Sequence, residues 1–177
     1  MKFKCFYFGL FIIPSLTLNA QESMFLQKNH SVSMEVLGLT YNYESPIAKR
    51  VTLIGRLGMQ GGAGYSSSLG SYYAISPAIS FETRFYYNIL KRESSGKNIK
   101  GNSANFLSLS TWYISNPVIE HKSSGADFFA VTPQWGVRRV YWKHFMLEAG
   151  AGISYFFNLE GDSKTNLMLN LRLGYMF

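Results

Sequence analysis

The sequence is poor in cysteine and in charged residues, and each shortage excludes a class of protein. Its 177 residues include a single cysteine, Cys5, and only 15% of them are charged. Because Cys5 lies in a predicted signal peptide, the processed chain would have no disulfide, thiolate metal site or cysteine nucleophile. The formal charge of +7 falls to +5 without Lys2 and Lys4. That excess is too small and scattered to indicate nucleic-acid binding, and attraction to an anionic lipid surface fits it equally well.

The sequence also lacks a long apolar run beyond residue 20. No later segment offers eighteen uninterrupted apolar residues, so a membrane-spanning helix is excluded there. Yet 47% of the residues are hydrophobic and 16% are aromatic, whereas soluble domains carry about 25% charged residues. So many aromatic residues beside so few charges favour a protein whose outer surface faces lipid. The length suits one domain.

Residues 1–20 have the layout of a secretory signal peptide. Lys2 and Lys4 precede an almost wholly apolar segment, and Ala20 supplies a small residue before the polar residues 21–23. The apolar segment is too short to span a membrane comfortably. We therefore expect cleavage after Ala20 and a single domain over residues 21–177. An uncleaved anchor helix is the alternative.

The rest of the chain repeatedly alternates apolar side chains with small or polar ones, which is typical of β-strands. In residues 72–87, for example, Ile75, Ile79 and Phe81 share one face, and Ser76 and Ser80 lie on the other. The alternation predicts seven strands, over residues 31–43, 51–63, 72–87, 104–113, 128–140, 145–157 and 166–177. Turns are predicted over residues 44–50, 64–71, 88–103, 114–127, 141–144 and 158–165.

The fold predicted from this pattern is all-β, a transmembrane antiparallel up-and-down β-barrel. Its non-apolar face is rich in Gly, Ala and Ser, which suit the crowded interior of a narrow barrel better than the surface of a soluble sandwich. Single-chain bacterial barrels have an even number of strands. We therefore predict eight, with the missing strand in residues 22–27. If the C-terminus is periplasmic, residues 44–50 and 88–103 are periplasmic turns too, and the second is unusually long and basic.

Several charged or amide side chains fall on the inward face in this register. They are Arg56, Glu82, Arg84, Gln134, Arg138, Glu148, Asn170 and Arg172. Opposite charges in a narrow, poorly hydrated interior are expected to pair and fill it. The alternative is a pore lining with a preference for anions, because arginine outnumbers glutamate in this set. Eight strands leave space for little more than side chains, which favours the paired structural network.

The final strand resembles the C-terminal signature through which outer-membrane barrels are recognised by their assembly machinery. Residues 171–177 end on Phe177, with Tyr175 two positions earlier and alternating leucines before it. Residues 39–46 with 51–59 resemble a hairpin of small eight-stranded outer-membrane barrels of the adhesin and porin-like type. Residues 81–88 with Lys91 and Arg92 are similar to a segment of uncharacterised outer-membrane β-barrel proteins. The resemblance implies a barrel fold and an outer-membrane location, and it implies no catalytic residues.

Two motifs could carry chemistry, and each has a plainer explanation. Residues 120–124 place Glu120, His121 and two serines together, as a lipid hydrolase with a Ser–His–acid group would need. However, they fall in a polar loop, and adjacent residues seldom converge on one substrate. His30 and His144 are expected at turns without metal-ligand spacing to His121. The glycines of residues 61–64 lack the Lys-Ser/Thr of a phosphate loop.

These observations predict a non-enzymatic integral outer-membrane barrel with a structural or surface-interaction role. A lipid A or phospholipid hydrolase and a narrow diffusion pore are the alternatives. We expect no cofactor and no metal. The expected partners are outer-membrane lipid and, during biogenesis, the barrel-assembly machinery, with no nucleic acid. The sequence does not identify a surface ligand.

Overall fold

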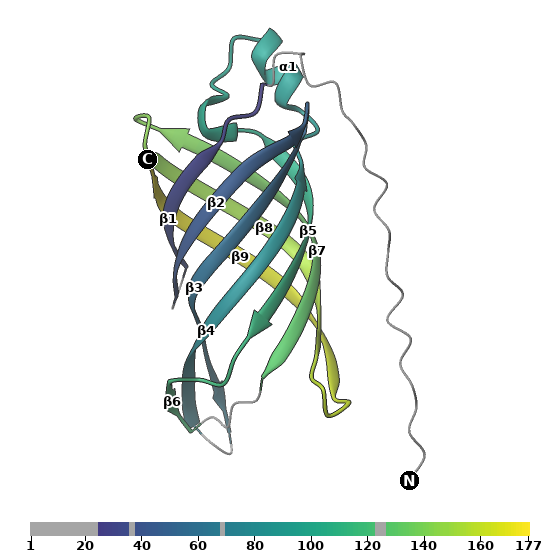
Figure 1. The fold of residues 1–177 in the computed structure, drawn as a ribbon. Helices are drawn as coiled ribbons and strands as arrows, with labels where there is room; N and C mark the ends of the chain where they lie inside the picture. The colour runs from purple at the N-terminus through teal and green to yellow at the C-terminus, as the bar shows by residue number, and fades with distance from the viewer. Residues whose placement is uncertain (1–24, 36–37, 68–69, 123–126) are drawn as a thin grey trace.

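Eight long strands follow one another around a closed ring, as Figure 1 shows. The structure is a computed structural model that describes residues 25–35, 38–67, 70–122 and 127–177. The predicted signal peptide lies outside the described residues. The strands of the ring are β1 (Asn29–Glu35), β2 (Gly38–Ala48), β3 (Val51–Ser66), β4 (Gly70–Phe85), β5 (Asn105–Ile114), β7 (Phe128–Tyr141), β8 (Phe145–Phe157) and β9 (Ser163–Met176).

Every neighbouring pair in the ring is antiparallel, and the first and last strands close it. Strand β1 pairs with β2 on one side and with β9 on the other, where Ser31 lies opposite Met176. Each remaining strand pairs with the one before and the one after it in the ring. The prediction of an all-β, antiparallel, up-and-down barrel of eight strands is therefore confirmed.

The predicted position of the eighth strand is wrong. The strand predicted over residues 31–43 is in fact two strands, β1 and β2, which pair with each other from Asn29↔Glu44 to Glu35↔Gly38. Only two residues separate them, Val36 and Leu37, and this apolar pair has none of the Gly, Asn or Asp that usually marks a tight hairpin. Of the residues predicted to form the eighth strand, 25–27 belong to no strand, and 22–24 lie outside the described residues.

Two segments predicted as turns contain secondary structure. Residues 114–127 include the short strand β6 (Ile119–His121), which pairs with β4 beyond the point where β5 ends. Residues 88–103 include the helix α1 (Ile89–Ser94) and the 3₁₀ helix η1 (Lys100–Asn102). Neither of these helices, nor any other in the described part of the chain, is long and apolar enough to cross a membrane.

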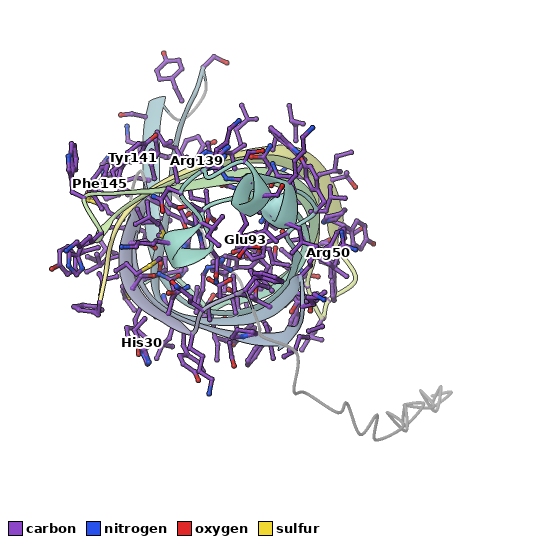
Figure 2. All side chains as sticks on the ribbon, turned by 90° about the horizontal axis from the view of Figure 1, so that it is seen from above. His30, Arg50, Glu93, Arg139, Tyr141 and Phe145 are labelled. Carbon is purple, nitrogen blue, oxygen red and sulfur yellow. The ribbon has the colours of Figure 1, made fainter. Side chains whose placement is uncertain are left out.

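The segment that links β4 to β5, residues 86–104, lies across one end of the barrel, and we call it the cap. It lies at the same end as the C-terminus (Figure 1). Figure 2, which looks down on this end, shows the helical segments of the cap within the ring of strands, and His30, Tyr141 and Phe145 around its outside. The capped end is thus the C-terminal end of the barrel, as the count of turns predicts for residues 88–103.

Burial alternates along the strands, and it is inverted relative to a soluble protein. Charged and hydroxyl side chains point into the barrel, so that Arg84 is 0% exposed and Glu148 is 1% exposed. Large apolar side chains point outward, so that Leu57 is 63% exposed and Leu167 is 76% exposed. Because neighbouring residues on a strand face opposite sides of the sheet, one alternation produces both surfaces.

Candidate functional site

The centre of the barrel interior is an ion pair between two strands that are not neighbours in the ring. The guanidinium of Arg84 on β4 donates to both carboxylate oxygens of Glu148 on β8, at 2.8 and 3.0 Å. Its Nε also donates to Glu82, two residues earlier on the same strand, at 2.8 Å. A forked, two-bond contact of this kind fixes the geometry of both groups.

Glu148 and Glu82 extend this pair into a network. Glu148 accepts a bond from Arg138 Nε at 2.9 Å and one from Arg172 Nη1 at 2.8 Å. Arg138 also pairs with Glu44, and Arg172 pairs with Glu35 at 2.6 Å. Arg56 pairs with Glu82 at 2.5 Å. We call these eight residues the ionic network. Every strand of the ring except β5 contributes at least one of them.

The eight side chains predicted to face inward are brought together in one connected region. The six charged ones belong to the ionic network, and the two amides border it. Gln134 donates to Ser108 Oγ at 3.0 Å and to Glu82 at 3.3 Å, and Asn170 donates to Gln134 at 2.7 Å. The amides therefore extend the hydrogen-bonded region beyond the charged side chains.

Two carboxylates of the network were missed by sequence reasoning. Glu44 falls in a predicted turn, and Glu35 lies in the middle of the strand that proved to be a hairpin. Both follow the inward parity of their own strands. A correct placement of the β1–β2 boundary would have found Glu35, and finding Glu44 also requires that β2 continue to Ala48. With them the network holds four arginines and four glutamates, so the arginine excess that suggested anion preference disappears.

Tyr86 joins the network to the cap. Its hydroxyl donates to Glu44 at 2.8 Å. It follows the last residue of β4, and burial raises the pKa of its phenol because the charged form is poorly solvated there. The hydroxyl thus remains a donor at ordinary pH.

Apolar packing closes the barrel directly beyond Tyr86. Leu26, Ile89, Ala104 and Phe106 form a buried cluster with it. The guanidinium carbon of Arg84 lies 3.7 Å from the centre of the Phe106 ring, so a cation–π contact lies between the network and the cluster. The Phe106 ring also covers Gly136, where any Cβ would collide with it.

Hydrogen bonds tie the cap to the start of β1 and to β7. The Asn102 side chain accepts from the backbone of Gln27 at 2.8 Å and donates back to it at 3.0 Å. Ser103 Oγ accepts from the Val140 amide at 2.9 Å. Gly101 has φ +58°, and a Cβ there would meet Val140 and Met176. The cap is therefore packed into the end of the barrel rather than left in solvent.

The far half of the interior is lined by smaller and less polar groups. Ala78, Trp112 and Ala130 form a buried cluster, and Thr132 Oγ1 and Ser154 Oγ share a hydrogen bond of 2.7 Å. A cavity of about 30 Å³ borders Trp112 and Phe156.

Tyr175 and Phe177, the residues of the predicted assembly signature, lie at the capped end and are exposed. Tyr175 stacks on His144, with ring centres 5.1 Å apart and an interplanar angle of 8°. The Phe177 amide donates to the His30 carbonyl at 2.9 Å, which extends the closure between β1 and β9. Met176, between them, is buried.

The predicted catalytic motif does not form a triad among the described residues. Glu120 and His121 are consecutive in β6 and therefore face opposite sides of the strand. His121 stacks on Tyr73, with ring centres 5.6 Å apart. The two serines of the motif, residues 123 and 124, lie outside the described residues.

Two residues, His30 and Gly64, lie in strands where the sequence predicted turns. His30 lies in β1 rather than in a turn, and His144 lies in the turn between β7 and β8 as predicted. Gly64, predicted to begin a turn, continues β3. Within the part of the chain that the structure describes, no group of three or more His, Cys, Asp or Glu is placed to hold a metal ion.

No known protein family matches the sequence, and no curated protein matches it either. Among solved structures, the chain is similar to Ail, the attachment invasion locus protein of Yersinia pestis, in complex with the heparin analogue sucrose octasulfate. The identity is 14%, the match covers 85% of this chain and 94% of that chain, and the TM-score is 0.28. A similarity of this size adds nothing to the strand pairing, which establishes the closed barrel without it.

Proposed function

We propose that the chain is an integral protein of the bacterial outer membrane, with a structural or surface-interaction role and no enzymatic activity. The single observation that carries this proposal is the inverted distribution of side chains. An apolar outer face surrounds the ring, and the ionic network fills its centre. The predicted signal peptide and the C-terminal signature support export and assembly in the same membrane.

The outward face is too apolar and too continuous for water. Soluble monomers rarely expose apolar patches of more than a few hundred Å². Here exposed leucines, isoleucines and aromatic residues occur on strands around the ring, and β9 alone presents Leu167, Leu169, Leu171 and Leu173. Acyl chains would cover this surface without any change in the protein. Strands of 10 to 16 residues, the lengths of every ring strand except β1, are long enough for a tilted crossing, which takes about 9–11 residues.

The interior supports a filled barrel rather than a pore. The ionic network occupies one half of the interior, and its end is closed by the cap and the cluster around Phe106. The other half holds bulky groups such as Trp112. Surface interaction would then depend on the loops. Strand β6 and the end of the β3–β4 hairpin lie at the end of the barrel opposite the cap (Figure 1).

Membrane fractionation and a heat-modifiability gel test the proposal. We expect the protein in the outer-membrane fraction after a carbonate wash, and we expect its electrophoretic mobility to change after boiling, because a closed barrel stays folded in cold detergent. Leu169→Arg would place a charge on the lipid face, whereas Leu159→Arg would place it in the exposed β8–β9 turn. Only the first should reduce insertion. Recovery of wild-type protein in the soluble periplasmic fraction would refute the proposal.

A further inference from the structure

A pocket rich in basic side chains lies on the outside of the barrel, where the cap meets β7. Its volume is about 570 Å³, and it is lined by Lys91, Arg92, Lys97 and Arg139 together with Tyr87 and two smaller polar residues. We call it the basic pocket. It is separate from the ionic network, because Arg139 faces outward on β7 whereas its neighbour Arg138 faces inward.

Among the described residues, no carboxylate neutralises the four cations of the basic pocket. No ion pair joins any of them to a carboxylate within the described part of the chain. Arg92 donates to the Asn98 carbonyl at 2.9 Å, but its buried Nε has no partner there. Four like charges around one pocket repel one another unless an anion enters, so the arrangement is complementary to a negatively charged group.

Arg139 is held in place before any ligand arrives. Its two terminal nitrogens donate to the Arg138 carbonyl at 2.6 Å and to the Asn105 side chain at 2.8 Å. A long side chain that is already ordered loses less conformational entropy on binding. Guanidinium groups are also suited to phosphate, which accepts two parallel hydrogen bonds from them.

An apolar groove adjoins the basic pocket on the lipid-facing surface. The groove is lined by Leu107, Pro133, Trp135, Ala151 and Ile153, with a volume of about 420 Å³. One hydrogen bond links the two features, because Trp135 of the groove donates to the hydroxyl of Tyr87 of the pocket at 2.9 Å. A polar pocket beside an apolar groove fits a molecule with an anionic head and an alkyl tail.

We propose that the basic pocket binds the phosphate of an anionic phospholipid and that the apolar groove receives one of its acyl chains. This inference rests on the proposed membrane location. The pocket lies at the capped end, next to the exposed aromatic residues Trp135 and Tyr141, and such rings favour the membrane interface where lipid phosphates lie. The groove favours a lipid over free phosphate, because free phosphate has no acyl chain to occupy it.

Binding is measured on the folded full chain in a zwitterionic detergent. Short-chain phosphatidylglycerol, short-chain phosphatidylcholine and inorganic phosphate are each titrated in, and the bound ligand is counted by native mass spectrometry. We expect phosphatidylglycerol to bind at least five-fold more tightly than phosphatidylcholine. The variant K91Q/R92Q/K97Q should lose this preference. The matched control K28Q/K100Q/K143Q removes the same charge from the same end of the barrel but outside the pocket, and it should keep the preference.

Trp135→Ala tests the contribution of the acyl chain separately from that of the phosphate. It should weaken the binding of phosphatidylglycerol several-fold and leave the binding of inorganic phosphate unchanged, because only the acyl chain contacts the groove. Equal losses in the pocket variant and its control would overturn the inference in favour of diffuse electrostatic attraction. Equal binding of the two lipids would overturn it as well. The inference would also be overturned if inorganic phosphate bound as tightly as phosphatidylglycerol and Trp135→Ala had no effect on the binding of either ligand.

Folding is monitored in parallel by the heat-modifiability gel. If the triple pocket variant does not fold, the pair K91Q/K97Q with its control K28Q/K143Q gives the same comparison. Failure of the wild-type chain to form a heat-modifiable barrel would refute the proposed function itself. A wild-type chain that folds but shows no preference between the lipids would refute only the lipid site.

Discussion

The two halves of the barrel interior are built from different chemistry. The half under the cap holds the ionic network, in which every charged group has an oppositely charged partner on another strand or on the same strand. The far half holds small residues, hydroxyl groups and Trp112. Both halves are filled, but only the first depends on particular pairs. The comparison indicates that specificity is concentrated at the end where the chain closes on itself, while the far end tolerates substitution.

The largest effect is expected at the hub of the ionic network. Glu148→Gln keeps the shape of the side chain but removes the charge that Arg84, Arg138 and Arg172 share. Leaving buried charges without their partner costs about 3–5 kcal/mol. We expect a loss of that size in the free energy of unfolding, measured by urea titration of the folded protein in detergent.

Glu160→Gln is the control for this prediction, because Glu160 is an exposed carboxylate in the β8–β9 turn. It should change the unfolding free energy by less than about 0.5 kcal/mol. A loss of under 1 kcal/mol for Glu148→Gln would show that the two halves of the interior do not differ in the way described above.

A somewhat smaller effect is expected at the contact between network and cap. Phe106→Ala removes a ring that is 1% exposed and that packs on both Arg84 and Gly136. We expect a loss of about 3 kcal/mol, at the lower end of the range for buried aromatic residues, since the cap can settle into part of the cavity.

Leu107→Ala, at the next position on β5, gives a matched comparison because Leu107 faces outward and is 51% exposed. Lipid or detergent covers that face in the folded state, so the loss should be under about 1 kcal/mol. Equal losses at the two positions would contradict the assignment of inner and outer faces.

The smallest effect is expected in the far half of the interior. Ser154→Ala removes the hydroxyl that shares a hydrogen bond with Thr132 and also contacts the Met168 sulfur at 3.0 Å. A single neutral hydrogen bond contributes about 1 kcal/mol, and the expected loss in urea titration is of that order. A loss as large as that of Glu148→Gln would remove the distinction between the two ends.

The fold could be predicted from the sequence because a barrel strand carries one repeating signal. Alternation placed Arg84, Glu148 and Arg172 on the inner face, and the outward leucines of β9 on the other. What alternation could not locate was the boundary between β1 and β2, since the sequence between Glu35 and Gly38 is apolar and does not visibly interrupt the pattern. That error displaced the predicted eighth strand to residues 22–27 and left Glu35 out of the network. Glu44 was left out because β2 continues to Ala48, through residues predicted as a turn.

The alternation of apolar and polar residues could not predict the cap or the basic pocket, for a different reason. Residues 88–103 read as a polar, basic turn, and nothing in their local composition says that Ile89 packs against Phe106 or that Asn102 bonds to Gln27. The second of these contacts joins positions 75 apart in the sequence. In the sequence, Arg139 is one more charge beside Arg138. Only the structure of β7 shows that the two side chains lie on opposite faces of the barrel wall.

The seam between β1 and β9 has a consequence for how the protein is made. Its pairs, such as Val32 with Tyr175, are separated by nearly the whole length of the barrel domain, so closing this loop is entropically the most demanding step. Arg172 reaches Glu35 and Glu148 only when β9 is in register. Strand β9 therefore completes the wall of the barrel, and a chain without β9 would be left as an open sheet with unpaired edges at β1 and β8.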